Sequence, residues 1–76
     1  MSPKLPAVSA RKAIKALQRI GYEVVRQKGT HIRLRNYRRP ECRPITVPNH
    51  TVLKPGLLRS ILHDANLSIE EFSDLL

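Results

Sequence analysis

The stretch that decides the fold is Arg26-Gln27-Lys28-Gly29-Thr30-His31-Ile32-Arg33-Leu34-Arg35. Its Lys28-Gly29 step is typical of a tight turn, because glycine tolerates a positive φ. The residues after the turn alternate in polarity, and this period of two predicts a β-strand. The positions expected to face the core are Thr30, Ile32 and Leu34. The stretch therefore predicts a β-hairpin with one apolar face and one charged face.

The solvent-facing positions of the same strand are His31, Arg33 and Arg35. Imidazole has an unperturbed pKa that lets it exchange protons near neutral pH. Guanidinium is planar and permanently charged, and its donors match phosphate oxygens. A histidine beside arginines on an exposed strand is therefore suited to RNA binding and cleavage. The alternative is a surface histidine without a chemical role.

An extended arm and a helix should precede the hairpin. Pro3 and Pro6 disfavour helix in residues 1–8, where little should be buried. Ser9 is a suitable N-cap, and Gly21 should end the helix as the residue after its C-cap. Apolar residues recur at helical spacing between these two positions. The expected buried stripe is Ala13, Ile14, Leu17 and Ile20.

Three short strands should form an antiparallel meander. The first two should span residues 22–27 and 30–35, and the third residues 45–47. Pro48 should end the third strand, because it has no N–H to donate to a ladder. Residues 36–43 are rich in arginine and proline, which predicts a loop. That loop either reaches over a bound polyanion or is a mobile hairpin tip.

Two helices should follow the sheet. Pro55 suits the first turn of one of them, and Asn66 should cap its C-terminus. Its expected buried stripe is Leu58, Ile61, Leu62 and Ala65. Ser68 and Glu71 have the spacing of a capping box, which starts the last helix. The predicted fold is α+β, in the order α-β-β-β-α-α, with the helices on one face of a small three-stranded antiparallel sheet.

Length and charge limit the classes of partner. The 76 residues predict a single domain over residues 1–76, with Lys and Arg numbering 14 against 6 acidic residues and a net charge of +8. A polyanion is the expected partner, and nucleic acid is favoured over a membrane because there is no long apolar run. Residues 1–6 lack the apolar segment of a signal peptide, so we expect a cytoplasmic protein.

The cysteine and histidine content does not favour a metal site. Cys42 is the only cysteine, so no intramolecular disulfide can form, and we interpret it as a bystander in the loop. His31, His50 and His63 are widely spaced and have no paired cysteines near them, which argues against zinc. No cofactor is expected.

The chain resembles the HicA toxins, the small mRNA interferases of HicA/HicB toxin-antitoxin systems. The resemblance covers nearly the whole chain. The matching pieces are Leu17 with Gly21-Tyr22, Arg26 before Gly29-Thr30-His31, Val47-Pro48 with His50, Leu53-Lys54-Pro55-Gly56 leading into Leu58-Arg59-Ser60-Ile61, and Leu67-Ser68-Ile69-Glu70-Glu71-Phe72. The Arg/Pro-rich residues 38–43 are a variable segment to which nothing carries over.

The resemblance implies a fold like that of a double-stranded-RNA-binding domain, cleavage of RNA by the histidine of the Gly-Thr-His motif, and neutralisation by a HicB antitoxin. That histidine corresponds to His31. The expected RNA-binding residues are Arg26, Lys28, Arg33 and Arg35. His50 is a candidate second proton carrier, with a structural or surface histidine as the alternative.

Two rival functions share the same basic surface. One is a non-catalytic RNA-binding module, which observed cleavage of RNA would exclude. The other is a basic subunit that meets only an acidic protein, and weak RNA binding without salt dependence would favour it.

Overall fold

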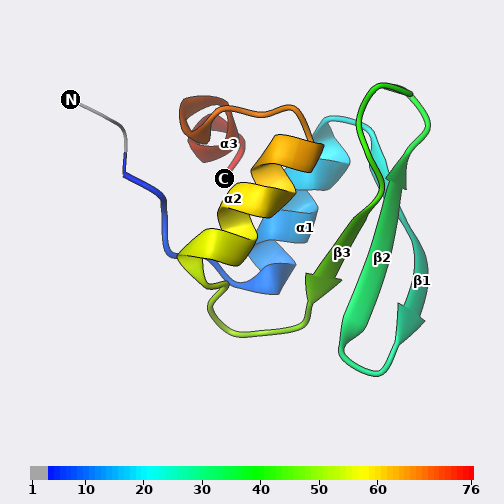
Figure 1. Cartoon of the computed structure of the whole chain (residues 1–76), viewed down its shortest axis with the longest axis horizontal. Helices are drawn as coiled ribbons and strands as arrows, with labels where there is room; N and C mark the ends of the chain where they lie inside the picture. The colour runs from blue at the N-terminus through cyan, green and yellow to red at the C-terminus, as the bar shows by residue number, and fades with distance from the viewer. Residues whose placement is uncertain (1–3) are drawn as a thin grey trace.

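The computed structural model describes residues 4–76, so the first residues of the expected arm lie outside the described part (Figure 1). The chain runs through α1 (Ala10–Arg19), β1 (Tyr22–Lys28), β2 (His31–Asn36), β3 (Ile45–Pro48), α2 (Pro55–Asp64) and α3 (Ile69–Leu75). This order confirms the predicted α-β-β-β-α-α arrangement. All the helices drawn lie on the same side of the sheet (Figure 1).

The boundaries of α1 follow from its capping residues. The Ser9 side chain accepts a hydrogen bond from the Lys12 N–H at 3.2 Å, as its role as N-cap predicts. Gly21 follows the C-cap residue Ile20 with a φ of +109°, which ends the helix. The residues that α1 buries are Ala10, Ala13, Ala16 and Leu17, while the predicted Ile14 and Ile20 are half-buried.

The strands form an antiparallel sheet in the order β1-β2-β3. In β2 the buried and exposed positions alternate without interruption, and Ile32 and Leu34 are buried as predicted. Thr30 was wrongly expected in the core. It is exposed because it belongs to the turn, and β2 begins only at His31.

The first strand departs from simple alternation. Val24 pairs with Leu34, but Arg26 rather than Val25 pairs with the next residue of β2, Arg33. Val25 is therefore the extra residue of a β-bulge. Past this point, each residue of β1 projects to the face opposite to the one that strict alternation would give it.

The last two helices are delimited by backbone hydrogen bonds. After α2, Asn66 has a φ of +57°, its N–H bonds to the His63 carbonyl at 3.1 Å, and the Leu67 N–H bonds to the Leu62 carbonyl at 2.9 Å. The predicted capping box of α3 is present, because the Glu71 N–H bonds to Ser68 Oγ at 3.0 Å and the Ser68 N–H bonds to Glu71 Oε1 at 2.9 Å.

The helices and the inner face of the sheet enclose the core. The largest fully buried side chains are Tyr22, Phe72, Leu17, Leu34, Leu58, Ile61 and Val47. The predicted stripe of α2 is buried throughout, including Ala65. The N-terminal arm contributes more than expected, because Val8 is buried and its carbonyl accepts the Leu53 N–H at 2.8 Å.

The loop between β2 and β3 is anchored rather than a free hairpin tip. Cys42 was wrongly interpreted as a bystander: it is buried, and its thiol donates to the Ala65 carbonyl at 3.4 Å. The Tyr22 hydroxyl donates to the Arg43 carbonyl at 2.7 Å, and the Arg43 N–H donates to the Asp64 carbonyl at 2.9 Å. These contacts tie the loop to the C-terminus of α2.

Candidate active site

The candidate site lies on the face of the sheet that the described helices leave open. Directly paired residues of an antiparallel sheet project to the same side. Lys28 pairs with His31, and His31 pairs with Pro48. One step along, Arg26 pairs with Arg33, and Arg33 pairs with Thr46. The sheet therefore carries two successive rows of these side chains on its outer face.

The bulge determines which side chains of β1 join these rows. Glu23 pairs with Arg35 and shares its face. Without the extra residue, alternation from Glu23 would bring Val25 and Gln27 to the outer face. With Val25 inserted, Arg26 and Lys28 take those positions. The bulge thus places two cations, Arg26 and Lys28, beside the histidine, where strict alternation would have placed Val25 and Gln27.

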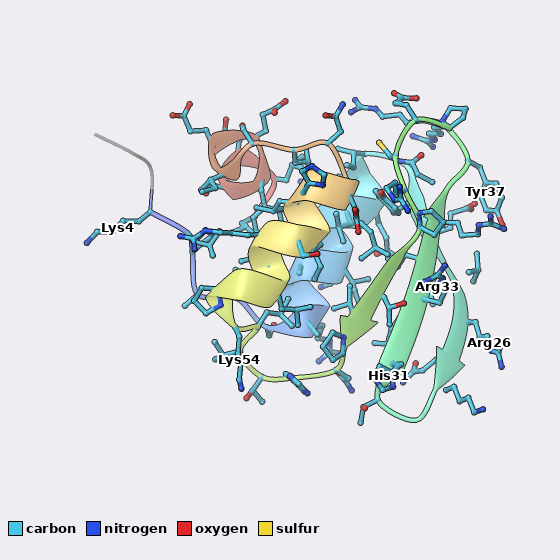
Figure 2. The ribbon with its side chains drawn as sticks, viewed as in Figure 1. Lys4, Arg26, His31, Arg33, Tyr37 and Lys54 are labelled. Carbon is cyan, nitrogen blue, oxygen red and sulfur yellow. The ribbon has the colours of Figure 1, made fainter. Side chains whose placement is uncertain are left out.

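The structure places five of the six predicted site residues on the same face of the sheet. They are His31, Lys28, Arg26, Arg33 and Arg35, and all are exposed. Figure 2 shows His31 at the start of β2, Arg33 further along the same strand and Arg26 on the neighbouring strand. We call this set the cationic face. Its cations can offset the charge of a phosphodiester that lies over β1 and β2.

One guanidinium of the cationic face has a fixed partner. Arg33 Nη1 donates to Thr46 Oγ1 at 2.9 Å, across the β2–β3 pair. This bond orients the Arg33 side chain over the sheet and leaves its other donors for a ligand. Thr46 is not among the predicted site residues, although its position between the apolar Ile45 and Val47 indicates an outward-facing residue.

His50 lies in the loop after β3, at the same end of the sheet as His31. The neighbouring Asn49 N–H donates to the Thr30 carbonyl at 2.6 Å, and this carbonyl belongs to the residue before His31. The His50 carbonyl accepts the Ala10 N–H at 3.0 Å, so its backbone is held by the start of α1. The His50 side chain is exposed.

His63 stands apart from the cationic face. It lies on α2, which covers the inner side of the sheet, and its Nδ1 is 3.8 Å from Asp64 Oδ1. Within residues 4–76, no group of three or more His, Cys, Asp and Glu side chains is arranged to hold a metal ion. None of the helices described is long and apolar enough to cross a membrane.

Comparison with known proteins gives one finding that bears on identity. A search of curated proteins returns no significant match. A protein-family model described as the HicA toxin of bacterial toxin-antitoxin systems matches residues 10–67, from the start of α1 to the residue before the α3 N-cap. The match covers more than half of the chain and includes the whole sheet. The chain belongs to the HicA toxin family and is the toxin of a toxin-antitoxin system.

Proposed function

We propose that this toxin is a metal-independent endoribonuclease, an mRNA interferase whose catalytic residue is His31. The observation that carries the proposal is the cationic face: an exposed imidazole at the start of β2, with Lys28 as its direct cross-strand partner and Arg26 and Arg33 in the next row. Membership of the HicA family supports the same function.

The chemistry needs few protein groups because RNA supplies its own nucleophile. A base removes the proton from a 2′-OH, the oxygen attacks the adjacent phosphorus, and an acid protonates the leaving 5′-oxygen. In our proposal His31 performs one of these proton transfers. Arg33 and Lys28 hold the phosphate and offset the negative charge that builds on its oxygens in the transition state.

His50 is our candidate for the second proton transfer. One imidazole can act as base and as acid only in turn. A second proton carrier would let the 2′-OH lose its proton and the 5′-oxygen gain one in the same step. The support is positional, because the Asn49–Thr30 hydrogen bond joins the His50 loop to the turn before His31.

A HicB-like antitoxin is the protein partner that we propose for the cationic face. Acidic or hydrogen-bonding groups of such a protein would complement the exposed cations and cover the imidazole. In the cell, the same surface would then be either open to RNA or closed by the antitoxin. A fully formed complex that still cleaves RNA at the free toxin's rate would contradict this mode of control.

Incubation of the purified protein with a labelled RNA in EDTA tests the nuclease proposal. We expect strand scission that leaves a 2′,3′-cyclic phosphate, because the attacking oxygen stays bound to phosphorus. The matched control is the same RNA with a single 2′-deoxynucleotide at the cleaved position, which should survive there. Cleavage that is lost in EDTA and restored by Mg²⁺ would contradict the proposal. RNA that is bound but never cut would instead support a non-catalytic RNA-binding module.

A further inference from the structure

Tyr37 is an aromatic residue that neither the fold nor the proposed chemistry uses. Tyr37 is 62% exposed, whereas Tyr22 and Phe72, the other Tyr and Phe residues of the sequence, are buried. Single exposed apolar side chains are common on protein surfaces and need no explanation alone. Three further observations set this ring apart: its anchorage, the space around it and its position relative to His31.

The backbone on both sides of Tyr37 is anchored. Asn36 is buried, its Oδ1 accepts the N–H groups of Arg38 at 3.0 Å and Arg39 at 2.9 Å, and its Nδ2 donates to the Ile20 carbonyl at 3.2 Å. The stem of Arg38 lies so close to Gly21 that a Cβ added there would be 3.0 Å from Arg38 Cβ. The ring is therefore presented from a fixed turn, which reduces the entropy lost when a ligand binds to it.

Open space adjoins the ring in two hollows. One, of about 430 Å³, is lined by Tyr37 together with Glu23, Val24 and Arg38 among others. The second, of about 300 Å³, is lined by Tyr37 together with Arg35 and Pro40 among others. Tyr37 is the residue shared by the linings of the two hollows. A flat ligand can enter beside the ring without displacing the core.

The ring also continues the line of the cationic face. Arg35 is the last outward-facing residue of β2, and Figure 2 shows His31, Arg33 and Tyr37 in succession along this side of the molecule. The rise of a strand, about 3.4 Å per residue, places Asn36 about 17 Å from His31. Stacked nucleotides rise by a similar distance, about 3.4 Å each, so about five of them would cover this length. An RNA strand in an extended conformation would cover it with fewer nucleotides.

We infer that Tyr37 is a stacking platform for a base of the RNA strand whose backbone lies on the cationic face, and that it selects single-stranded over duplex RNA. The inference rests on the proposed function. Unpaired bases stack on aromatic side chains with little regard to sequence, whereas the bases of a duplex are already stacked on each other. Arg35 and Arg38, which each line one of the two hollows beside Tyr37, supply charge for the flanking phosphates.

The test compares Tyr37→Phe with Tyr37→Leu, both in a His31→Ala background that should not cut the RNA. Phe keeps the ring, and Leu keeps an apolar side chain without it. We expect Tyr37→Leu to weaken binding of a single-stranded oligonucleotide by about tenfold or more, and Tyr37→Phe to weaken it by less than about threefold. Affinity for a duplex of the same length should change little in either variant. Thermal unfolding of both variants should match that of the parent, because the side chain is exposed.

Fluorescence locates the base. The fluorescent adenine analogue 2-aminopurine is moved one position at a time along the oligonucleotide. Binding to the His31→Ala protein should quench it at a position up to about five nucleotides from the bond that the wild-type protein cleaves. Tyr37→Leu should abolish that quenching. Unchanged single-strand affinity in Tyr37→Leu, or an equal loss for duplex RNA, would overturn the inference. Unchanged RNA affinity with weakened antitoxin binding would also overturn it and assign the ring to the protein interface.

The two proposals can fail separately. If the wild-type protein binds RNA without cutting it, but quenching still depends on the ring of Tyr37, the nuclease proposal fails and the stacking platform stands. If the wild-type protein cuts RNA in EDTA and Tyr37→Leu binds single strands normally, the nuclease proposal stands and the stacking platform fails.

Discussion

Arg26 and Arg33 are direct cross-strand partners, so two guanidinium groups project from facing positions of β1 and β2. Like charges at such positions destabilise a sheet, by up to about 1 kcal/mol. The pair exists only because the bulge at Val25 brings Arg26, rather than Val25 itself, opposite Arg33. We interpret this repulsion as a cost in stability that accompanies the proposed binding of phosphate.

Arg26→Gln should therefore stabilise the fold and weaken RNA binding. We expect the free energy of unfolding to rise by about 0.5 kcal/mol at low ionic strength, and the gain to shrink in salt that screens the repulsion. RNA affinity should fall, with a shallower dependence on salt. Urea unfolding and RNA titration at two salt concentrations measure both effects. The control is Arg59→Gln on α2, outside the cationic face, which should leave the RNA affinity nearly unchanged.

His31→Ala should separate catalysis from folding. The side chain is exposed and its neighbour Ile32 makes the core contacts, so we expect the free energy of unfolding to change by less than about 1 kcal/mol. Cleavage should fall at least about a hundredfold, which is typical for the loss of a general acid or base. RNA binding should persist through Arg33 and Arg35.

The matched control for this substitution is His63→Ala, because the His63 side chain is exposed on α2. Cleavage, RNA affinity and thermal unfolding measured on the same preparations give the answer. An unfolded His31→Ala protein would make the residue structural. A folded variant with full cleavage would move the chemistry elsewhere, and His50 would be the next residue to test.

The Tyr22 hydroxyl should make stability fall at alkaline pH. Burial, and then the nearby Cys42 and Asp64, raise the pKa of this hydroxyl above its ordinary value of about 10. The folded state keeps the proton when the unfolded chain loses it, so the stabilisation is complete below about pH 10 and is lost as the pH rises above that value.

Tyr22→Phe tests this dependence. Near neutral pH the variant should be about 1 to 2 kcal/mol less stable, because the Arg43 carbonyl loses its hydroxyl partner. Above about pH 10 the difference between the two proteins should narrow. Denaturant unfolding from pH 7 to pH 11 measures it, and a difference that stays constant across this range would refute the assignment.

Gly21 and Gly29 should differ in their tolerance of alanine. Both have positive φ, which costs an alanine about 1 to 2 kcal/mol. A Cβ on Gly29 would meet nothing within 4 Å, whereas one on Gly21 would lie 2.8 Å from Asn36 Oδ1, which is held by its own hydrogen bonds. Gly21→Ala should therefore destabilise the fold by clearly more than Gly29→Ala, as thermal unfolding of the pair would show.

The secondary structure could be predicted because its signals are local. Ser9 and Gly21 each act on the adjacent end of α1, and Ser68 acts with Glu71 three residues later; the structure confirms each of these signals. Apolar periodicity likewise predicted the buried stripe of α2 and the inner face of β2. Both signals depend on the order of residue types and not on what the chain meets after folding.

The features that could not be predicted depend on contacts between distant segments. Cys42 is buried because the loop closes onto the end of α2, a contact that its basic neighbours in the sequence do not indicate. The faces of Arg26 and Lys28 depend on the bulge, which is a property of the pairing between two strands. Residue type was enough to predict which residues form the cationic face. Which of them lie opposite each other across the strands could be known only from the register of the sheet.

The bulge at Val25 has a further consequence, for the behaviour of the protein at high concentration. In the sheet described, β1 is an edge strand, and Val24 and Val25 are 44% and 42% exposed. Such an edge can pair with the edge of another molecule and start aggregation. A bulge that bends and twists the strand, with charged residues such as Glu23 beside it, is a device that natural sheets use against such pairing. One inserted residue thus both arranges the charges of the outer face and discourages molecules from joining edge to edge.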